Sequence, residues 1–209
     1  MKVWRGTALL LIGQALALLS GYGIQVFLAR TLEPAGYGTF GVVQSILMVV
    51  ELFVVAGIPN ALKRYVGEDP KQGRGLHRFL FRWQMMLAFT LFAVTFLAAP
   101  WIAAALNDDS ITLILRWAVI DIIFFGLYWY YNGFLTGQRR FAQQTMMVSA
   151  YTVSKFLLVV GLVTVSDNVI GAFVANFVAS IVGWLTGYAL LKIGDDEREV
   201  SKAAQAQFI

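Results

Sequence analysis

Four charged side chains lie within long apolar stretches of this sequence: Glu51, Arg116, Asp121 and Lys155. Charged groups are costly in hydrocarbon, so they usually pair with one another or face a cavity or a transport pathway. The two carboxyl groups fit either of two roles, as sites for coupling protons or as counter-ions of the two basic groups. Because two acids and two bases cancel, their charge alone selects neither an anionic nor a cationic cargo. Arg116 lies about 7 Å from the end of its stretch, so it either faces the interior or extends to the membrane surface.

Uncharged polar residues share faces with these charges. Residues 4, 7 or 11 positions apart lie on one face of a helix, and four of the stretches carry such a polar face. The members are Gln14 and Gln25; Gln44 and Glu51; Asp121, Tyr128 and Asn132; and Gln144, Tyr151 and Lys155. We predict that these faces line a shared, water-accessible interior. The alternative, which is favoured for any single glutamine, is hydrogen bonding between helices in a packed bundle.

The composition places these residues in a membrane protein. Hydrophobic residues make up 59% of the 209 residues and charged residues only 13%, whereas soluble domains average about 25% charged residues. A transmembrane helix needs about 20 mostly apolar residues. Six ranges meet this requirement: 7–29, 39–58, 83–106, 111–134, 141–165 and 169–191. The sequence therefore predicts an all-α integral membrane protein with a bundle of six transmembrane helices over residues 1–193.

The basic residues predict how the bundle sits in the membrane. Outside the predicted helices, one side holds nearly all lysines and arginines, whereas the other side holds Arg30 alone. Because loops rich in Lys and Arg stay in the cytoplasm, we expect both termini to be cytoplasmic, in a multi-pass protein of the cytoplasmic (inner) membrane. Pro59–Arg82 is then the only long inner connection. Its mixture of cations and aromatic residues indicates an interfacial segment that leads into the third helix.

A short outer hairpin is predicted between the first two helices. Pro34, Gly36 and Gly38 are turn-forming residues at the point where the chain must reverse. Glu33 lies close enough in the sequence to pair with Arg30, the single cation on this side. An interfacial turn explains both features without a function.

Small residues recur every four positions along the sixth helix, at Ala175, Ala179, Gly183 and Gly187. Such a stripe lets another helix backbone approach closely, so we expect it to contact a partner inside or outside this chain. The charged segment 194–209 that follows is typical of a cytoplasmic linker. We interpret the chain as truncated before a second unit, or as a half-size protein that pairs with a second copy.

Several classes of function have no support in the sequence. There is no cysteine, and the single histidine, His77, lies outside the predicted helices. An intramembrane hydrolase or a histidine-based metal centre needs histidine at membrane depth, and no nucleotide-binding loop of the G-x-x-x-x-G-K type is present. We therefore expect no catalytic residue, no metal or other cofactor and no nucleic-acid partner.

Three stretches together resemble a known family. They are LARTLEPAGYGTFG at residues 28–41, GIPNALKRYVGE at 57–68 and NGFLTGQRRF at 132–141. With these stretches in order, the chain is similar to the oligosaccharide flippases of polysaccharide biosynthesis. These are the O-antigen and teichoic-acid export proteins of the multidrug/oligosaccharidyl-lipid/polysaccharide exporter superfamily. The resemblance covers the whole chain and implies the N-terminal lobe of a two-lobed exporter, with a central cavity between the lobes.

The resemblance also implies a cargo, polyprenyl-diphosphate-linked oligosaccharide, which alternating access moves to the outer leaflet. It makes Arg116 and Lys155 candidates for contact with the diphosphate, or for ion pairs that face the cavity. The candidates for sugar contacts or coupling are Gln14, Gln25, Gln44, Glu51 and Asp121, and the further cavity-lining candidates are Tyr128, Asn132 and Tyr151. Expected partners are the lipid-linked glycan, membrane lipids and a second lobe, which would be contacted through Ala175, Ala179, Gly183 and Gly187. Two alternatives remain open: a cation-coupled drug antiporter of the same superfamily, and a membrane scaffold or fragment that transports nothing.

Overall fold

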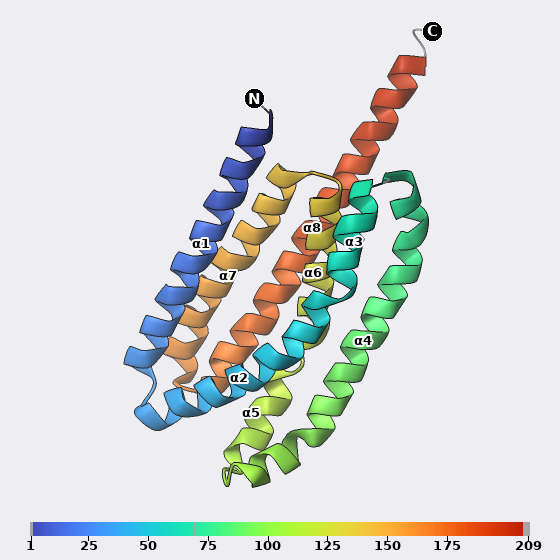
Figure 1. The fold of residues 1–209 in the computed structure, drawn as a ribbon. Coiled ribbons are helices and arrows are strands. Elements are labelled where there is room, and N and C mark those ends of the chain that lie inside the picture. The colour runs from blue at the N-terminus through green and yellow to red at the C-terminus, as the bar shows by residue number, and fades with distance from the viewer. Residues whose placement is uncertain (1, 69, 207–209) are drawn as a thin grey trace.

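The structure is a computed structural model that describes the backbone of residues 2–68 and 70–206 and the side chains of residues 8, 10–68 and 79–192. Within these residues every regular element is an α-helix. In chain order they are α1 (Lys2–Thr31), α2 (Pro34–Ala56), α3 (Ile58–Glu68), α4 (Pro70–Ala105), α5 (Ser110–Ala118), α6 (Asp121–Gly137), α7 (Phe141–Ser166) and α8 (Val169–Ala206). Figure 1 shows an elongated bundle in which α1 begins and α8 ends at the same end, which we call the terminal end.

The described helices contain six stretches long and apolar enough to cross a membrane. They cover Leu10–Thr31, Pro34–Glu68, Phe79–Ala105, Ser110–Gly137, Phe141–Ser166 and Val169–Lys192. The predicted all-α bundle of six spans is therefore confirmed. Its second and fourth spans are each built from two consecutive helices, α2 with α3 and α5 with α6, which the apolar pattern does not reveal.

The hairpin between α1 and α2 is tighter than the sequence predicts. Only Leu32 and the next residue separate α1 from α2, and Pro34 is the first residue of α2, where its missing N–H would have no helical partner in any case. Gly36 and Gly38 therefore lie within a helix rather than in a turn. The predicted ion pair of Glu33 with Arg30 does not form. The only ion pair among the described residues joins two residues of α3, Arg64 and Glu68.

The long connection predicted at Pro59–Arg82 is helical rather than a loop. α3 ends at Glu68 and α4 begins at Pro70, and the described part of the third span covers Phe79–Ala105. The side chains of residues 71–78, which include the predicted interfacial contacts, lie outside the described residues. The side chains of the predicted linker 194–209 do too, although its backbone continues α8 as a helix to Ala206.

The second span is interrupted at Gly57. Pro59 has no backbone N–H and cannot continue the hydrogen-bond ladder of α2, so a new helix, α3, starts beside it. The side chain of Gln84 on α4 crosses to this break. Its Nε2 donates to the carbonyl oxygens of Val54 and Gly126, each at 3.4 Å, which ties α2, α4 and α6 together.

The small-residue stripe of α8 packs inside the bundle. α8 has its most extensive contacts with α7 and also packs against α6. Ala175 and Ala179 are fully buried. A Cβ atom on Gly183 or Gly187 would lie 2.6 Å or 2.7 Å from side-chain atoms of α6 and α7, respectively. The expectation that this stripe contacts a second lobe or a second copy is therefore wrong, since the stripe is already used within the chain.

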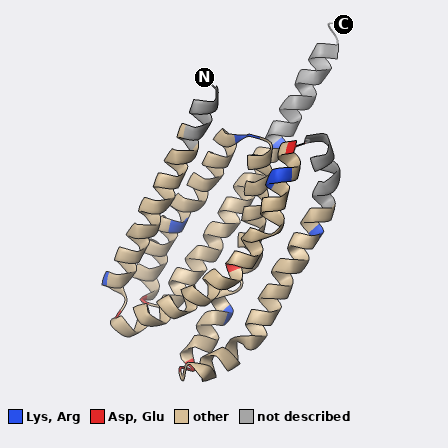
Figure 2. Cartoon of the chain, in the orientation of Figure 1, with Lys and Arg blue, Asp and Glu red and all other residues tan. Residues whose placement is uncertain are grey.

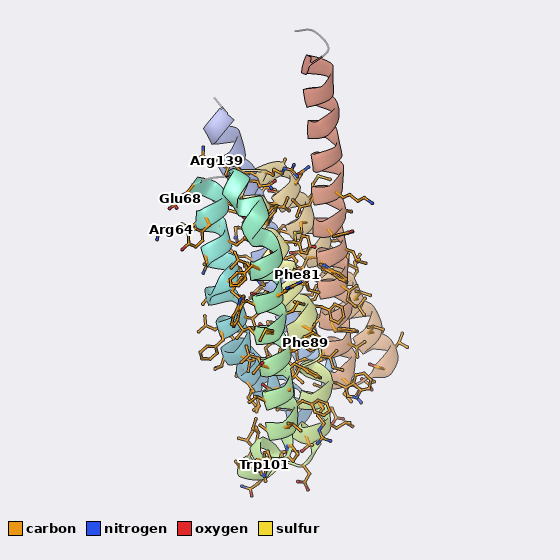
Figure 3. The ribbon with its side chains drawn as sticks, turned by 90° about the vertical axis from the view of Figure 1, so that its right-hand side faces the viewer. Arg64, Glu68, Phe81, Phe89, Trp101 and Arg139 are labelled. Carbon is orange, nitrogen blue, oxygen red and sulfur yellow. The ribbon has the colours of Figure 1, made fainter. Side chains whose placement is uncertain are left out.

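The outer surface has the character of membrane helices. In Figure 3, Phe81, Phe89 and Trp101 mark α4 from near the terminal end to the opposite end, and Phe89 and Trp101 are 53% and 74% exposed. Arg64 and Glu68, which pair at 3.0 Å, lie near the terminal end. In Figure 2, more of the blue Lys and Arg positions lie near the terminal end than elsewhere in the part of the chain that is not grey.

Candidate functional site

A polar cavity of about 260 Å³ lies between α1, α2, α7 and α8. α1 packs along α7 but touches α2 only sparsely, which leaves space between them. The polar lining residues are Gln25 on α1, Gln44 on α2, Lys155 on α7 and Asn176 on α8. Apolar side chains of the same four helices, Phe40 and Phe173 among them, complete the wall. Only the fold brings these groups together, because the consecutive helices α1 and α2 lie far in the sequence from the consecutive helices α7 and α8.

Lys155 is the only charged residue that lines the cavity. Its Nζ atom lies 5.7 Å from the centroid of the Tyr151 ring, one turn earlier on α7, within the range of a cation–π contact. Tyr151 stacks on Tyr128 of α6, with ring centroids 4.5 Å apart. Lys155 therefore contacts a stacked pair of aromatic rings that joins α7 to α6.

Asp121 is buried at the break in the fourth span, with 1% of its surface exposed. It is the first residue of α6, where the helix dipole favours a negative side chain. One carboxyl oxygen accepts a hydrogen bond from Nδ2 of Asn176 on α8, and the other has no partner among the described residues. Ser180, one turn further along α8, lies beside this carboxyl and the Tyr151 phenol but meets neither at full hydrogen-bond geometry.

Glu51 of α2 completes a group of three charges, which we call the charge cluster. The carboxyl groups of Glu51 and Asp121 and the ammonium group of Lys155 lie close enough to act on one another electrostatically. None of the pairs makes direct contact as an ion pair among the described residues. Charges interact strongly where water is scarce, so the two carboxyl groups offset the charge of Lys155.

The amides of the cavity keep hydrogen-bonding groups unused. Oε1 of Gln25 accepts a hydrogen bond from the Tyr37 hydroxyl at 3.1 Å, which leaves its amino group available. Gln44 is half-buried and makes no hydrogen bond to the described residues. Asn176 donates to Asp121, and its Oδ1 has no partner there. The cavity therefore offers both donors and acceptors to a polar ligand.

Three predicted site residues lie apart from this group. Gln14 is exposed on α1 and does not line the cavity. Arg116 lies on α5, with its guanidinium carbon 5.0 Å from the centroid of the Phe96 ring, in a separate depression of the surface. Asn132 is buried beside Tyr128, one turn later on α6, where it belongs to the packing of that helix.

Gln84, Asn176 and Ser180 are among the buried polar residues that a search for polar helix faces misses. Asn176 and Ser180 are four positions apart on α8, a spacing that is visible in the sequence. Because they are short, uncharged and surrounded by small residues, they resemble packing positions. Gln84 is isolated in its span, and no spacing indicates that it binds backbone carbonyls.

The chemistry of the site is hydrogen bonding and charge compensation. In the part of the chain that the structure describes, no three His, Cys, Asp or Glu side chains gather into a metal-binding group. A mostly apolar wall with a few polar groups is the usual composition of a small-molecule site. The arrangement is therefore suited to holding a polar solute within the membrane.

The family of the chain follows from its sequence taken as a whole. The model of the family described as polysaccharide biosynthesis protein matches residues 3–208. The chain belongs to this family. The resemblance carried by the three glycine-containing stretches is thereby confirmed. No curated protein matches the chain in sequence.

Solved membrane transporters share the fold of this family member. A crystal structure of MATE in the straight conformation matches 93% of the chain with a TM-score of 0.81 and 16% identity. An outward-facing multidrug resistance MATE family transporter of the MOP superfamily matches 93% of the chain, with a TM-score of 0.79 and 15% identity. A MOP superfamily transporter from Pyrococcus furiosus matches 90% of the chain, with a TM-score of 0.78 and 14% identity. The chain spans 45%, 45% and 44% of these proteins, respectively. It therefore has the fold of somewhat less than half of such a transporter.

Proposed function

We propose that this family member forms one lobe of a two-lobed exporter, which moves polyprenyl-diphosphate-linked oligosaccharide across the cytoplasmic membrane for surface polysaccharide biosynthesis. The observation that carries the proposal is a polar cavity among the apolar spans of a polysaccharide biosynthesis protein. A glycan that crosses hydrocarbon needs partners that replace its water. The unused amides of the cavity supply such partners, while the prenyl chain stays in lipid.

In this proposal both termini face the cytoplasm. The greater number of Lys and Arg segments near the terminal end (Figure 2) supports this orientation, because cationic connections remain inside. The second lobe faces the cavity-bearing side of the first, and the pair opens alternately to the two sides of the membrane. Gln25, Gln44 and Asn176 contact the glycan, and the charge cluster keeps the interior hydrated and open.

A strain without this gene tests the proposed cargo. We expect it to lose surface polysaccharide and to accumulate the polyprenyl-linked precursor in the cytoplasmic leaflet, and we expect the gene on a plasmid to reverse both effects. Precursor in the cytoplasmic leaflet is measured in spheroplasts as the fraction that an added, membrane-impermeant glycosidase cannot cleave. Normal surface polysaccharide without accumulation of precursor would contradict the proposal.

A cation-coupled drug antiporter is the second candidate. Two observations favour it: solved neighbours include a multidrug resistance transporter, and two carboxyl groups, of Glu51 and Asp121, lie among the spans near Lys155. In that case the deletion strain becomes sensitive to cationic drugs and keeps its surface polysaccharide. A scaffold without transport activity would change neither property.

A further inference from the structure

We propose that the cavity between α1, α2, α7 and α8 binds one uncharged sugar ring of the transported glycan and excludes the diphosphate that joins the glycan to its lipid. This inference rests on the proposed function and specifies which part of the cargo the cavity takes. Three properties of the cavity carry it: its size, its unused hydrogen-bonding groups and its balance of charge.

The cavity is too small for a whole oligosaccharide. Drug-sized ligands occupy pockets of about 300–1,000 Å³, whereas this cavity measures about 260 Å³. That volume suits a single sugar ring with its hydroxyl groups, while the rest of the glycan lies outside the cavity.

The unused polar groups complement sugar hydroxyls. A hydroxyl group both donates and accepts hydrogen bonds, and so does a carboxamide. Gln25 retains its amino group as a donor because Tyr37 occupies its oxygen, whereas the oxygen of Asn176, whose amino group binds Asp121, is buried without a partner at the edge of the cavity. Gln44 retains both groups. The three amides lie on three different helices, so together they can bind hydroxyls on several edges of one ring.

The apolar wall complements the remaining surface of a sugar. Phe40 on α2 and Phe173 on α8 are almost fully buried, and their ring centroids lie 5.3 Å apart with the planes tilted by 32°. A sugar ring presents C–H faces between its hydroxyl edges. Such a face can lie against the apolar wall, in which Met48 is 70% exposed and the two phenylalanines form the packed base.

The charge balance disfavours the diphosphate. Lys155 is the only cation among the lining residues, and it interacts with the carboxyl groups of both Glu51 and Asp121. A diphosphate would add negative charge beside these two carboxyl groups, where low polarity makes repulsion strong. An uncharged ring leaves the charge cluster undisturbed. Lys155 therefore already faces two acidic groups, which weakens its attraction for an anion.

Binding of simple glycosides to the purified protein in lipid nanodiscs tests this inference. The probes are methyl α-D-glucopyranoside and methyl N-acetyl-β-D-glucosaminide as neutral rings, with glucuronate and inorganic pyrophosphate as anions, and binding is measured by saturation-transfer difference NMR. We expect saturable binding of at least one neutral glycoside. We expect neither anion to displace it at equal concentration.

Matched substitutions assign the binding to the cavity. Gln44→Leu removes unused hydrogen-bonding groups and should weaken glycoside binding about tenfold, which corresponds to about 1.4 kcal/mol. Gln14→Leu makes the same exchange at an exposed position outside the cavity and should leave binding unchanged. Displacement by pyrophosphate, loss of pyrophosphate binding in Lys155→Met, or equal glycoside binding by the two leucine variants would overturn the inference.

The two proposals fail in distinguishable ways. If the deletion strain accumulates precursor but the protein binds no neutral glycoside in its cavity, the proposed function stands and the sugar subsite is refuted. If the protein binds a glycoside through Gln44 but the deletion strain makes normal surface polysaccharide, the proposed export function is refuted instead. Binding with the expected selectivity, together with accumulation of precursor, supports both.

Discussion

Glutamine side chains have different roles in two regions of the bundle. Where α2 diverges from the packed pair of α1 and α7, Gln25 and Gln44 line a cavity and keep hydrogen-bonding groups unused. Where α2, α4 and α6 converge, Gln84 is fully buried and its amino group lies between the carbonyl oxygens of two neighbouring helices. The difference shows that an intramembrane glutamine is available to a ligand only where the helices leave space around it.

Glycines show the same contrast. A Cβ atom on Gly133 of α6 would lie 2.7 Å from the carbonyl oxygen of Pro59, whereas one on Gly161 of α7 would meet nothing within 4 Å. The backbones of α3 and α6 are therefore in close contact at Gly133, whereas α7 has free space beside Gly161. Substitutions in matched pairs test this difference between the convergent and the divergent region.

The largest expected effect is on transport. Lys155→Ala leaves the carboxyl groups of Glu51 and Asp121 without the cation that compensates them, and uncompensated buried charge is strongly unfavourable. We expect surface polysaccharide to fall at least tenfold while the protein still inserts into the membrane, as measured by immunoblot of membrane fractions. Arg116→Ala removes a cation outside the cavity and should leave transport within about twofold, because only its contact with the Phe96 ring is lost. Equal effects of the two substitutions would contradict the assignment of the cavity.

A smaller effect is expected for stability at the convergent region. Gly133→Ala forces a methyl group against the Pro59 carbonyl, and overpacking of this kind costs about 1–3 kcal/mol. The midpoint of thermal unfolding in detergent should fall. Gly161→Ala is the matched control, and its midpoint should stay the same or rise slightly, because alanine favours a helix more than glycine does. Similar midpoints for the two variants would mean that α3 and α6 are not in close contact.

The next effect compares the two kinds of glutamine. Gln84→Leu removes the donor that bridges Val54 and Gly126, and loss of a buried hydrogen bond costs about 1 kcal/mol. Gln44→Leu should leave the unfolding midpoint unchanged, because Gln44 makes no hydrogen bond to the described residues. Urea-dependent unfolding monitored by tryptophan fluorescence can measure both. A larger loss of stability in Gln44→Leu would reverse the comparison.

The smallest effect is expected at the surface. Arg64 and Glu68 form an ion pair at 3.0 Å, but their side chains are 78% and 61% exposed. Solvent-exposed pairs contribute little to stability. Arg64→Ala should therefore leave the thermal midpoint unchanged within error, and a clear drop would show that this end of α3 makes contacts beyond the ion pair.

The spans and one aromatic–lysine contact follow directly from the sequence. Long apolar runs can be recognised without knowing which helices pack together. The four-residue spacing of Tyr151 and Lys155 places them on one helix face however the helices pack. The Glu51, Asp121 and Lys155 group was likewise expected to share an interior, and the structure brings these residues into electrostatic range. Their roles in transport remain predictions.

The remaining features depend on which helices meet. Gln14 and Gln25 share a face by spacing, yet only Gln25 lines the cavity, because the two positions lie about 16.5 Å apart along the helix. The stripe of α8 fits a contact inside or outside the chain equally well, and only the fold shows that α6 and α7 fill it. The break before Asp121 has no proline or glycine beside it, so local propensity does not predict it.

The most direct test of the cavity as the cargo site uses the absence of cysteine from the chain. Gln44→Cys provides a single thiol in the cavity, and Gln14→Cys provides one outside it. The measurement is the rate of labelling by a water-soluble maleimide in membrane vesicles, with and without the lipid-linked glycan. The account predicts that Gln44→Cys is labelled and that the glycan slows its labelling, with no change for Gln14→Cys. Labelling at position 44 that the glycan does not slow would contradict it.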